Sequence, residues 1–281
     1  MRAGIFARSL AGRGAPARAG LRGEIRAAVR LLLGLALPAA LPLALLALWQ
    51  IAAAEAWVAP QILPAPSIVL ASFADLIRDG ELWANLTVSL GRIVLGFALG
   101  AAAGLVVGVA FGIWPRTEQY FGPTLRALAQ VPSIGWLPFF ILIFGLGETL
   151  NAVLIAKACF VPTVLSTVGG IDAIDKRYLD VARALRLPRR ALVLRLVLPA
   201  ALPDIASGVR LALGQAWVSL IVVEMLADTE GVGYLMTWGR TIFQTDIVIV
   251  GMIVIGAIGF LMDTGLRRLE RRLQSWRPEH A

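Results

Sequence analysis

The sequence predicts an all-α integral membrane protein with six transmembrane helices and both termini in the cytoplasm. Apolar residues make up 58% of the chain and charged residues 16%, a balance too apolar for an ordinary soluble domain. Three uncharged stretches are long enough to cross a bilayer as helices. The apolar runs do not alternate with polar residues, as the strands of a membrane barrel would, so helices are expected.

The six predicted spans follow one another from residue 31 to residue 266. The uncharged ones are 31–54, 93–114 and 127–147, each above the roughly 20 residues that a crossing helix needs. The other three each contain one charged residue: 149–171 with Lys157, 205–223 with Arg210, and 247–266 with Asp263. Between the first two spans, prolines lead into an amphipathic segment at about 67–78 that is typical of a membrane interface.

Basic residues orient the chain. Residues 1–30, 115–126, 172–204 and 267–281 contain 21 of the 26 Lys and Arg residues, whereas the alternate connections contain only Arg78 and Arg240. This bias places the basic segments in the cytoplasm. The predicted organisation is a basic tail at 1–30, a membrane domain at 31–266 with a cytoplasmic loop at 172–204, and a second basic tail at 267–281. Since the charge follows topology, we expect no nucleic-acid partner.

The sequence offers little for catalysis. A single cysteine, Cys159, and a single histidine, His280, exclude an intrachain disulfide and a Cys/His metal cluster. There is no G-x-x-x-x-G-K-[ST] phosphate-binding loop, no paired carboxylates and no Ser/His dyad. We therefore expect no catalytic residue, no metal and no cofactor bound by this chain, which is not predicted to be an enzyme.

The loop at 172–204 is built to fold rather than to link. It has no Gly or Ser cluster, and its apolar residues recur at helical spacing. A helix is predicted at 178–186, and Pro188 suits the first position of a second helix, with a bend near 186–187. Val181, Ala182, Leu185 and Leu187 give the loop an apolar surface flanked by charges, which favours docking on a partner over a solvated basic loop.

From Asp180, the pattern D-V-A-x3-R-x9-L-x-L-P resembles, at every spacing, the E-A-A-x3-G-x9-I-x-L-P loop of ATP-binding-cassette importer permeases. The resemblance implies a MetI-like permease fold and a loop that docks on a separate ATPase subunit, which binds the ATP. Arg186 replaces the family's glycine; if that glycine is left-handed, Arg186 costs on the order of 1 kcal/mol, unless the corner has another geometry. The implied docking residues are Asp180, Val181, Ala182, Arg183 and Arg186, with Leu198 and Pro199 as the join to the next helix.

Stretches from about 60 to 275, among them "GELWANLTVSLGRIVLGFALG" and "QVPSIGWLPFFILIFGLGE", resemble the nitrate, sulfonate and taurine branch of these permeases, and aliphatic-sulfonate permeases in particular. The resemblance implies import of a small anion by alternating access. It also implies a permease homodimer, two ATPase subunits and an external substrate-binding protein. Which anion is carried, and whether the dimer is a homodimer or a heterodimer, stays open at this point.

Several residues inside the predicted spans are candidates for function. Glycines recur every four residues along the second span and predict close helix packing, either within the subunit or at a sliding or dimer surface. The "QVPSIGWLP" segment predicts a break that faces a cavity or, alternatively, a buried proline kink. The glycines are Gly96, Gly100, Gly104, Gly108 and Gly112; the candidate pathway residues are Gln130, Ser133, Trp136, Lys157, Arg210 and Glu224.

The charged candidates each have an alternative role, and the whole chain has an alternative function. Lys157 is predicted either to attract an anion or to pair with another helix, and Arg210 and Glu224 lie near helix ends, where ion pairing or snorkelling competes with a pathway role. An ion-coupled secondary transporter is the alternative function; it would favour mid-membrane carboxylates and inverted repeats, which the sequence does not show.

Overall fold

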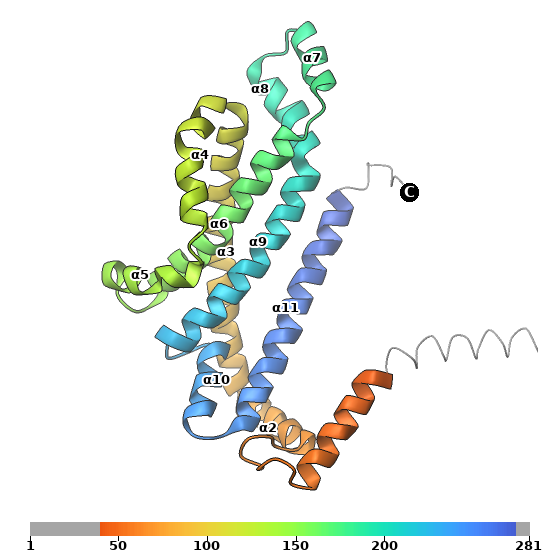
Figure 1. Ribbon diagram of the computed structural model, residues 1–281, viewed down its shortest axis with the longest axis vertical. Coiled ribbons are helices and arrows are strands. Elements are labelled where there is room, and N and C mark those ends of the chain that lie inside the picture. Colours follow the sequence, from red (N-terminus) through yellow and green to blue (C-terminus); the bar gives the residue numbers. More distant parts are fainter. Residues whose placement is uncertain (1–39, 274–281) are drawn as a thin grey trace, which may run out of the picture. The chain divides into compact units, whose positions relative to one another are not determined.

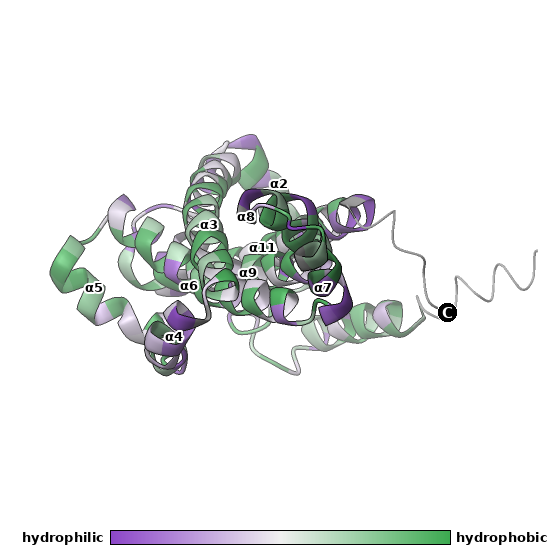
Figure 2. Ribbon diagram, turned by 90° about the horizontal axis from the view of Figure 1, so that it is seen from above, coloured by the Kyte–Doolittle hydropathy of each residue, from purple (hydrophilic) through white to green (hydrophobic). Residues whose placement is uncertain are grey.

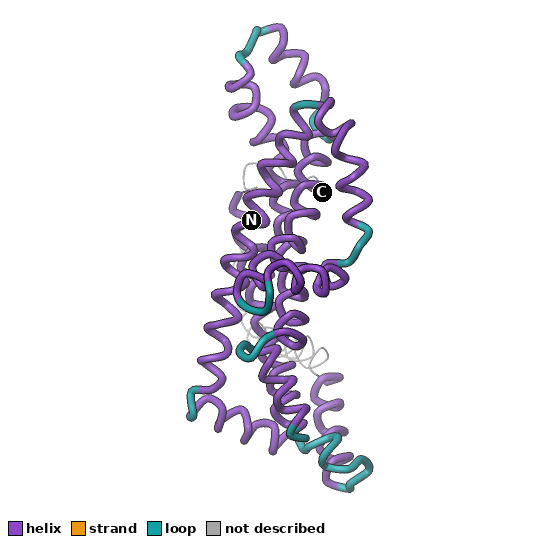
Figure 3. The backbone as a smooth tube through the Cα atoms, turned by 90° about the vertical axis from the view of Figure 1, so that its left-hand side faces the viewer, coloured by secondary structure: helices purple, strands orange, loops and turns teal. Residues whose placement is uncertain are grey.

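The computed structural model describes residues 40–273, and in this part of the chain every regular element is a helix (Figure 3). The chain divides after Ser67 into two compact units. The first contains an apolar helix, Ala40–Ala54, whose Trp49 indole donates to the Pro64 carbonyl at 3.0 Å. The predicted tail at 1–30, residues 31–39 of the first predicted span, and residues 274–281 lie outside the described residues.

The second unit contains all the remaining helices. A helix at the predicted amphipathic segment comes first, and its place at a membrane interface stays a prediction. In chain order the elements are α2 (Pro66–Arg78), α3 (Glu81–Ile113), α4 (Pro115–Ala129), the 3-10 turn η1 (Ser133–Trp136), α5 (Leu137–Phe144), α6 (Glu148–Asp172), α7 (Lys176–Ala184), α8 (Arg189–Leu192), the π-helical turn η2 (Val193–Val197), α9 (Leu198–Ala227), α10 (Val232–Thr241) and α11 (Thr245–Leu273).

Four helices among the described residues are long and apolar enough to cross a membrane, or five if a bent pair counts as one span. They are α3, α6, the continuous helix Arg190–Ala227, and α11. All four begin earlier than predicted, because the sequence-based limits stopped at charged residues. In α3 and α6 these residues are Arg92 and Glu148, which the fold pairs with each other. The bent pair is the third predicted span.

That third span was predicted at 127–147, with either a break that faces a cavity or a buried proline kink at residues 130–138. The segments Arg116–Ala129 and Ser133–Phe144 meet at 92°, so α5 turns away from α4 (Figure 1). Pro132 lacks an N–H and pushes the residue before it out of the helical conformation, which explains a break at this position. The predicted break is therefore confirmed, and it is sharper than a kink within one span.

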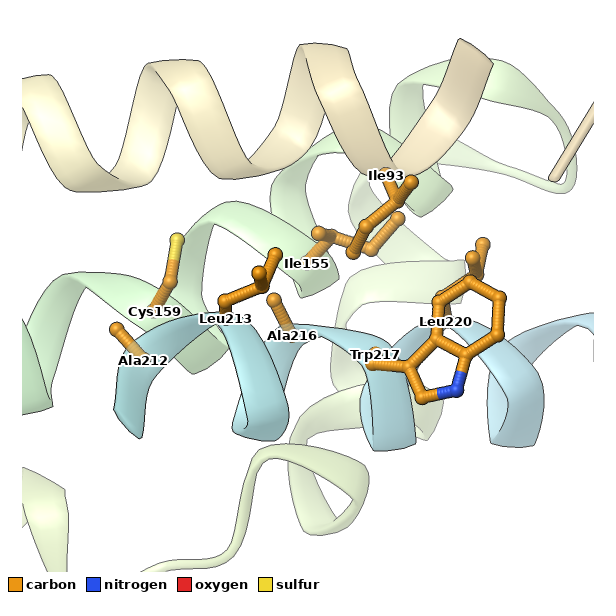
Figure 4. Close-up of a cluster of buried hydrophobic side chains, with 8 residues drawn as sticks. All are labelled: Ile93, Ile155, Cys159, Ala212, Leu213, Ala216, Trp217 and Leu220. Carbon is orange, nitrogen blue, oxygen red and sulfur yellow. The ribbon is translucent and has the colours of Figure 1, made fainter. Parts of the chain in front are cut away.

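The core of the second unit forms where α3, α6 and α9 pack together. Figure 4 shows its centre, with Ile93 from α3, Ile155 and Cys159 from α6, and Leu213 and Trp217 among the residues from α9. Along α3 the five glycines face α6. A Cβ atom at Gly108 would lie 2.6 Å from Thr167 Cβ, so the backbones approach closely because the stripe has no side chains.

The outer surface of these helices is strongly apolar. Leu142 on α5 is 85% exposed and Phe260 on α11 is 69% exposed. Hydrophobic residues also cover much of α5 and α9 when the unit is viewed from above (Figure 2). Exposed apolar patches on this scale are unfavourable in water and are expected of helices that contact lipid or another membrane subunit.

Candidate functional site

The corner between α7 and α8 lies at one end of the second unit (Figure 1). α7 ends at Ala184 and α8 begins at Arg189, which confirms the predicted bend. Arg186 has φ 49°, so it is left-handed, and of the two predicted alternatives it is the strained one that holds. The Leu187 N–H donates to the Ala182 carbonyl at 3.1 Å, a bond typical of helices that end in a left-handed residue.

The apolar surface of this corner differs from the prediction at one residue. Val181 and Leu185 are 58% and 68% exposed, and they lie four residues apart on one face of α7. Ala182 is 3% exposed, so its inclusion in the exposed surface was wrong, because the next residue along the helix turns to the packed side. Asp180 is exposed, Arg183 lies in α7, and Leu198 and Pro199 begin α9, at the predicted join.

A buried ion cluster lies at the other end of the core, around Arg92. The Arg92 side chain is 6% exposed and meets three carboxylates. Its Nη2 lies 2.6 Å from Glu148 Oε1, its Nη1 lies 3.2 Å from Glu224 Oε1, and its Nη2 lies 3.5 Å from Asp228 Oδ1. The cluster therefore joins α3, α6, the end of α9 and the segment that follows it.

Glu224 is fully buried at the centre of this cluster. Its carboxylate accepts from the Ser89 hydroxyl at 2.7 Å and from the Gly233 N–H at 3.0 Å. Ser89 Oγ in turn accepts the Val232 N–H at 2.9 Å. These bonds hold the start of α10 against α3, so the structure shows Glu224 as an ion-paired residue inside the subunit.

Asp228 and Asn151 form a hydrogen-bonded pair at the edge of the cluster. Asn151 Nδ2 donates to Asp228 Oδ1 at 3.0 Å, whereas Asn151 Oδ1 and Asp228 Oδ2 are buried without a hydrogen-bond partner among the described residues. Burial raises the pKa of the Asp228 carboxyl, although the hydrogen bond from Asn151 and the charge of Arg92 act in the opposite direction.

Arg210 belongs to a second ion cluster, between α9 and α11. Its Nε lies 2.9 Å from Glu270 Oε2, and its Nη1 lies 3.4 Å from Asp263 Oδ1. Ser207 also donates to Glu270, at 2.6 Å. Arg210 thus ties two long helices together.

The remaining candidates gather at the break between α4 and α5. Lys157 Nζ donates to the Val131 carbonyl at 3.0 Å and lies 5.4 Å from the centre of the Trp136 ring. Gln130 is exposed and Ser133 is half-buried on the same segment. Lys157 and Trp136 are therefore in contact, whereas Arg210 and Glu224 belong to the two ion clusters.

Sequence reasoning missed most of the cluster around Arg92. Only Glu224 was among the predicted site residues, whereas Arg92, Glu148, Asn151, Ser89 and Asp228 were not singled out. The sequence did contain a signal for this cluster, because acidic residues stand just before and after apolar runs. These acids meet at one arginine only because α3 packs against α6 and α9, which the sequence pattern does not show.

The comparisons with known proteins agree with this architecture. Residues 96–275 match the family model described as "Binding-protein-dependent transport system inner membrane component". The chain is 40% identical over 233 residues, 83% of this chain and 84% of the relative, to a putative aliphatic sulfonates transport permease protein, SsuC, of Bacillus subtilis (strain 168). It is 33% identical to the taurine transport system permease protein TauC of Escherichia coli (strain K12), over 84% of this chain and 87% of the relative.

A more distant relative and a solved structure point the same way. The nitrate import permease protein NrtB of Leptolyngbya laminosa is 28% identical over 78% of this chain and 80% of the relative. The inward-facing MetNI methionine ABC transporter contains a chain with the same fold, with a TM-score of 0.56 and 16% identity over 66% of this chain and 92% of that chain. The chain therefore belongs to the family of binding-protein-dependent transport system inner membrane components, and it is a multi-pass permease subunit of an ABC importer, not an enzyme.

Proposed function

We propose that this permease imports a small oxyanion, such as an aliphatic sulfonate, taurine or nitrate, by alternating access. The proposal is supported by relatives named for these three solutes that align over most of the chain. In the proposed assembly two copies of the chain, each with six spans and cytoplasmic termini, stand on two ATPase subunits. ATP is bound by those subunits, and an external binding protein delivers the solute.

The α7–α8 corner is the observation that carries the ATPase-docking part of the proposal. It projects from the packed helices and exposes Val181 and Leu185 on one face beside basic residues, with Arg186 held at the turn. An exposed apolar face on a helix suits a groove in a soluble partner. We assign Asp180, Val181, Ala182, Arg183 and Arg186 to docking, with Ala182 acting from the packed side of α7, and Leu198 and Pro199 to the connection with α9.

The break at 130–136 supports the proposed pathway, because irregular backbone at membrane depth is tolerated where it faces protein or water. We place Gln130, Ser133, Trp136 and Lys157 along the pathway. Arg210 and Glu224, the other two pathway candidates, act through the helices that they pair.

Uptake by the complete transporter tests the function. Permease, ATPase subunits and binding protein are reconstituted in liposomes with ATP inside, and labelled ethanesulfonate, taurine and nitrate are offered outside. We expect ATP-dependent uptake of at least one anion and none with an ATPase variant that cannot hydrolyse ATP. Uptake by the permease without the ATPase, driven by a proton or sodium gradient, would instead indicate the secondary transporter.

Coupling is tested at the corner. Asp180→Ala, Arg183→Ala and Leu185→Asp are each expected to lower uptake per ATP hydrolysed at least about tenfold, because a lost docking contact of 1–3 kcal/mol weakens the joint by that order. Leu185→Met is the matched control and should resemble the unaltered protein. Normal coupling in all three variants would place the ATPase elsewhere on the permease.

A further inference from the structure

Lys157 differs from Arg92 and Arg210, two other cations on the long apolar helices. Arg92 meets three carboxylates and Arg210 meets two. Among residues 40–273, no carboxylate lies within ion-pair distance of Lys157 Nζ, whose contacts are the Val131 carbonyl and the Trp136 ring. An ammonium group in a span without a counter-charge is costly and marks a functional position by default.

Lys157 lies far enough along α6 for this cost to apply. It lies nine residues after Glu148, where α6 begins, which is about 13 Å along an axis about 37 Å long. Lys157 is also half-buried, so part of it faces outward from the subunit. Hydrocarbon cannot solvate an ammonium group there, and this face of α6 must therefore open onto water or another polar surface.

The two present contacts of Lys157 are exchangeable. In a continuous helix the Val131 carbonyl would accept the N–H of residue 135, but the Gly135 N–H donates to the Pro132 carbonyl at 2.9 Å. The break thus frees the Val131 carbonyl, and Lys157 fills the vacancy with one of its three donors. The Trp136 indole Nε1 is buried without a hydrogen-bond partner in the described part of the chain. The break therefore has N–H donors on Lys157 and Trp136 that have no acceptor among the described residues.

We propose that Lys157 is the counter-ion for the oxyanion group of the transported solute, which takes the place of the Val131 carbonyl during passage. This rests on the proposed function as an anion importer. Sulfonate and nitrate each spread one negative charge over three acceptor oxygens, so they can bind an ammonium group and neighbouring N–H donors together. The carbonyl competes for the same ammonium group, and this competition keeps the site weak enough for the solute to leave.

Charge-matched variants in the complete transporter test the site. Labelled ethanesulfonate, taurine and nitrate are the probes, and ATP hydrolysis stimulated by the loaded binding protein is measured in the same liposomes. Lys157→Met is expected to lower anion uptake per ATP hydrolysed at least about tenfold, because a charge-assisted contact is lost, while stimulated hydrolysis continues. Lys157→Arg should stay within about threefold of the unaltered protein. Arg78→Met, which removes an exposed cation, should have no effect.

The outcomes separate the two proposals. If the unaltered transporter takes up none of the three anions, the proposed function is overturned. If it takes up an anion and Lys157→Met does so equally well, the role of Lys157 alone is overturned. Equal losses in Lys157→Met and Lys157→Arg would also overturn it, because side-chain shape rather than charge would then matter.

Discussion

Arg92 and Arg186 place the same side chain in opposite settings. Arg92 is buried in a regular helix and surrounded by Glu148, Glu224 and Asp228. Arg186 is exposed at the corner, in a left-handed conformation that a glycine would adopt more easily. The comparison indicates that one end of the core is fixed by internal pairing, whereas the other end leaves its residues available to a partner. The effects of substitutions at the two ends should therefore differ in kind as well as in size.

The largest effect is expected from Arg92→Met. It leaves Glu224 and Asp228 buried without their cation, and breaking a buried ion pair in this way costs about 3–5 kcal/mol. We expect a large fall in the midpoint of thermal unfolding of the purified permease and poor recovery from membranes. Arg78→Met, which removes an exposed pair with Asp75, should change the midpoint little. Similar midpoints for both variants would show that the cluster does not hold this end together.

Gly100→Ala should have the next largest effect. The added Cβ would overlap the Ala156 carbonyl and Cys159 Sγ, so α3 and α6 would have to move apart at a cost of about 1–3 kcal/mol. Gly91→Ala is the matched control on the same helix, because a Cβ there meets nothing within 4 Å. The control should be neutral or slightly stabilising in the same unfolding measurement. A loss of stability in Gly91→Ala alone would contradict the packing described for this stripe.

Arg186→Gly should act in the opposite direction. Removing the left-handed strain is expected to stabilise the corner by up to about 1 kcal/mol, while Arg186→Lys should leave the strain unchanged. Hydrogen exchange of residues 184–190 would report the local gain, as slower exchange in the glycine variant. Equal exchange in the two variants would mean that the left-handed conformation costs nothing here.

The smallest effect is expected from Asp228→Asn, which sharpens the account of the Arg92 cluster. The new amide oxygen can still accept from Asn151 Nδ2, and Arg92 keeps Glu148 and Glu224 as partners, so stability should change by no more than about 1 kcal/mol. Burial raises the pKa of Asp228 in the folded protein, so its favourable contribution is present at low pH and is lost as pH rises through that pKa. The variant should lack this pH dependence. A steeper dependence in the variant would assign the titration to another carboxylate.

Much of the fold could be predicted from the sequence, because apolar length and basic loops report on the bilayer directly. The amphipathic helix α2, the break before Ser133 and the corner near Arg186 each had a local signal in proline or amphipathic spacing. The 92° turn of α5 and the burial of Ala182 depend on packing between distant segments, which a local pattern does not encode. For the same reason, Lys157 could be recognised as a candidate, but its contacts with Val131 and Trp136 could not.

The continuous helix from Arg190 to Ala227 has a consequence for how the two ends communicate. Its 38 residues are about 57 Å long, and it begins at the corner and carries Glu224 close to its other end. The π-helical turn at Val193–Val197 lies near the corner and does not interrupt this helix. If a nucleotide-driven subunit tilts α8, this continuous helix would carry the movement along its axis to the buried Glu224 carboxylate.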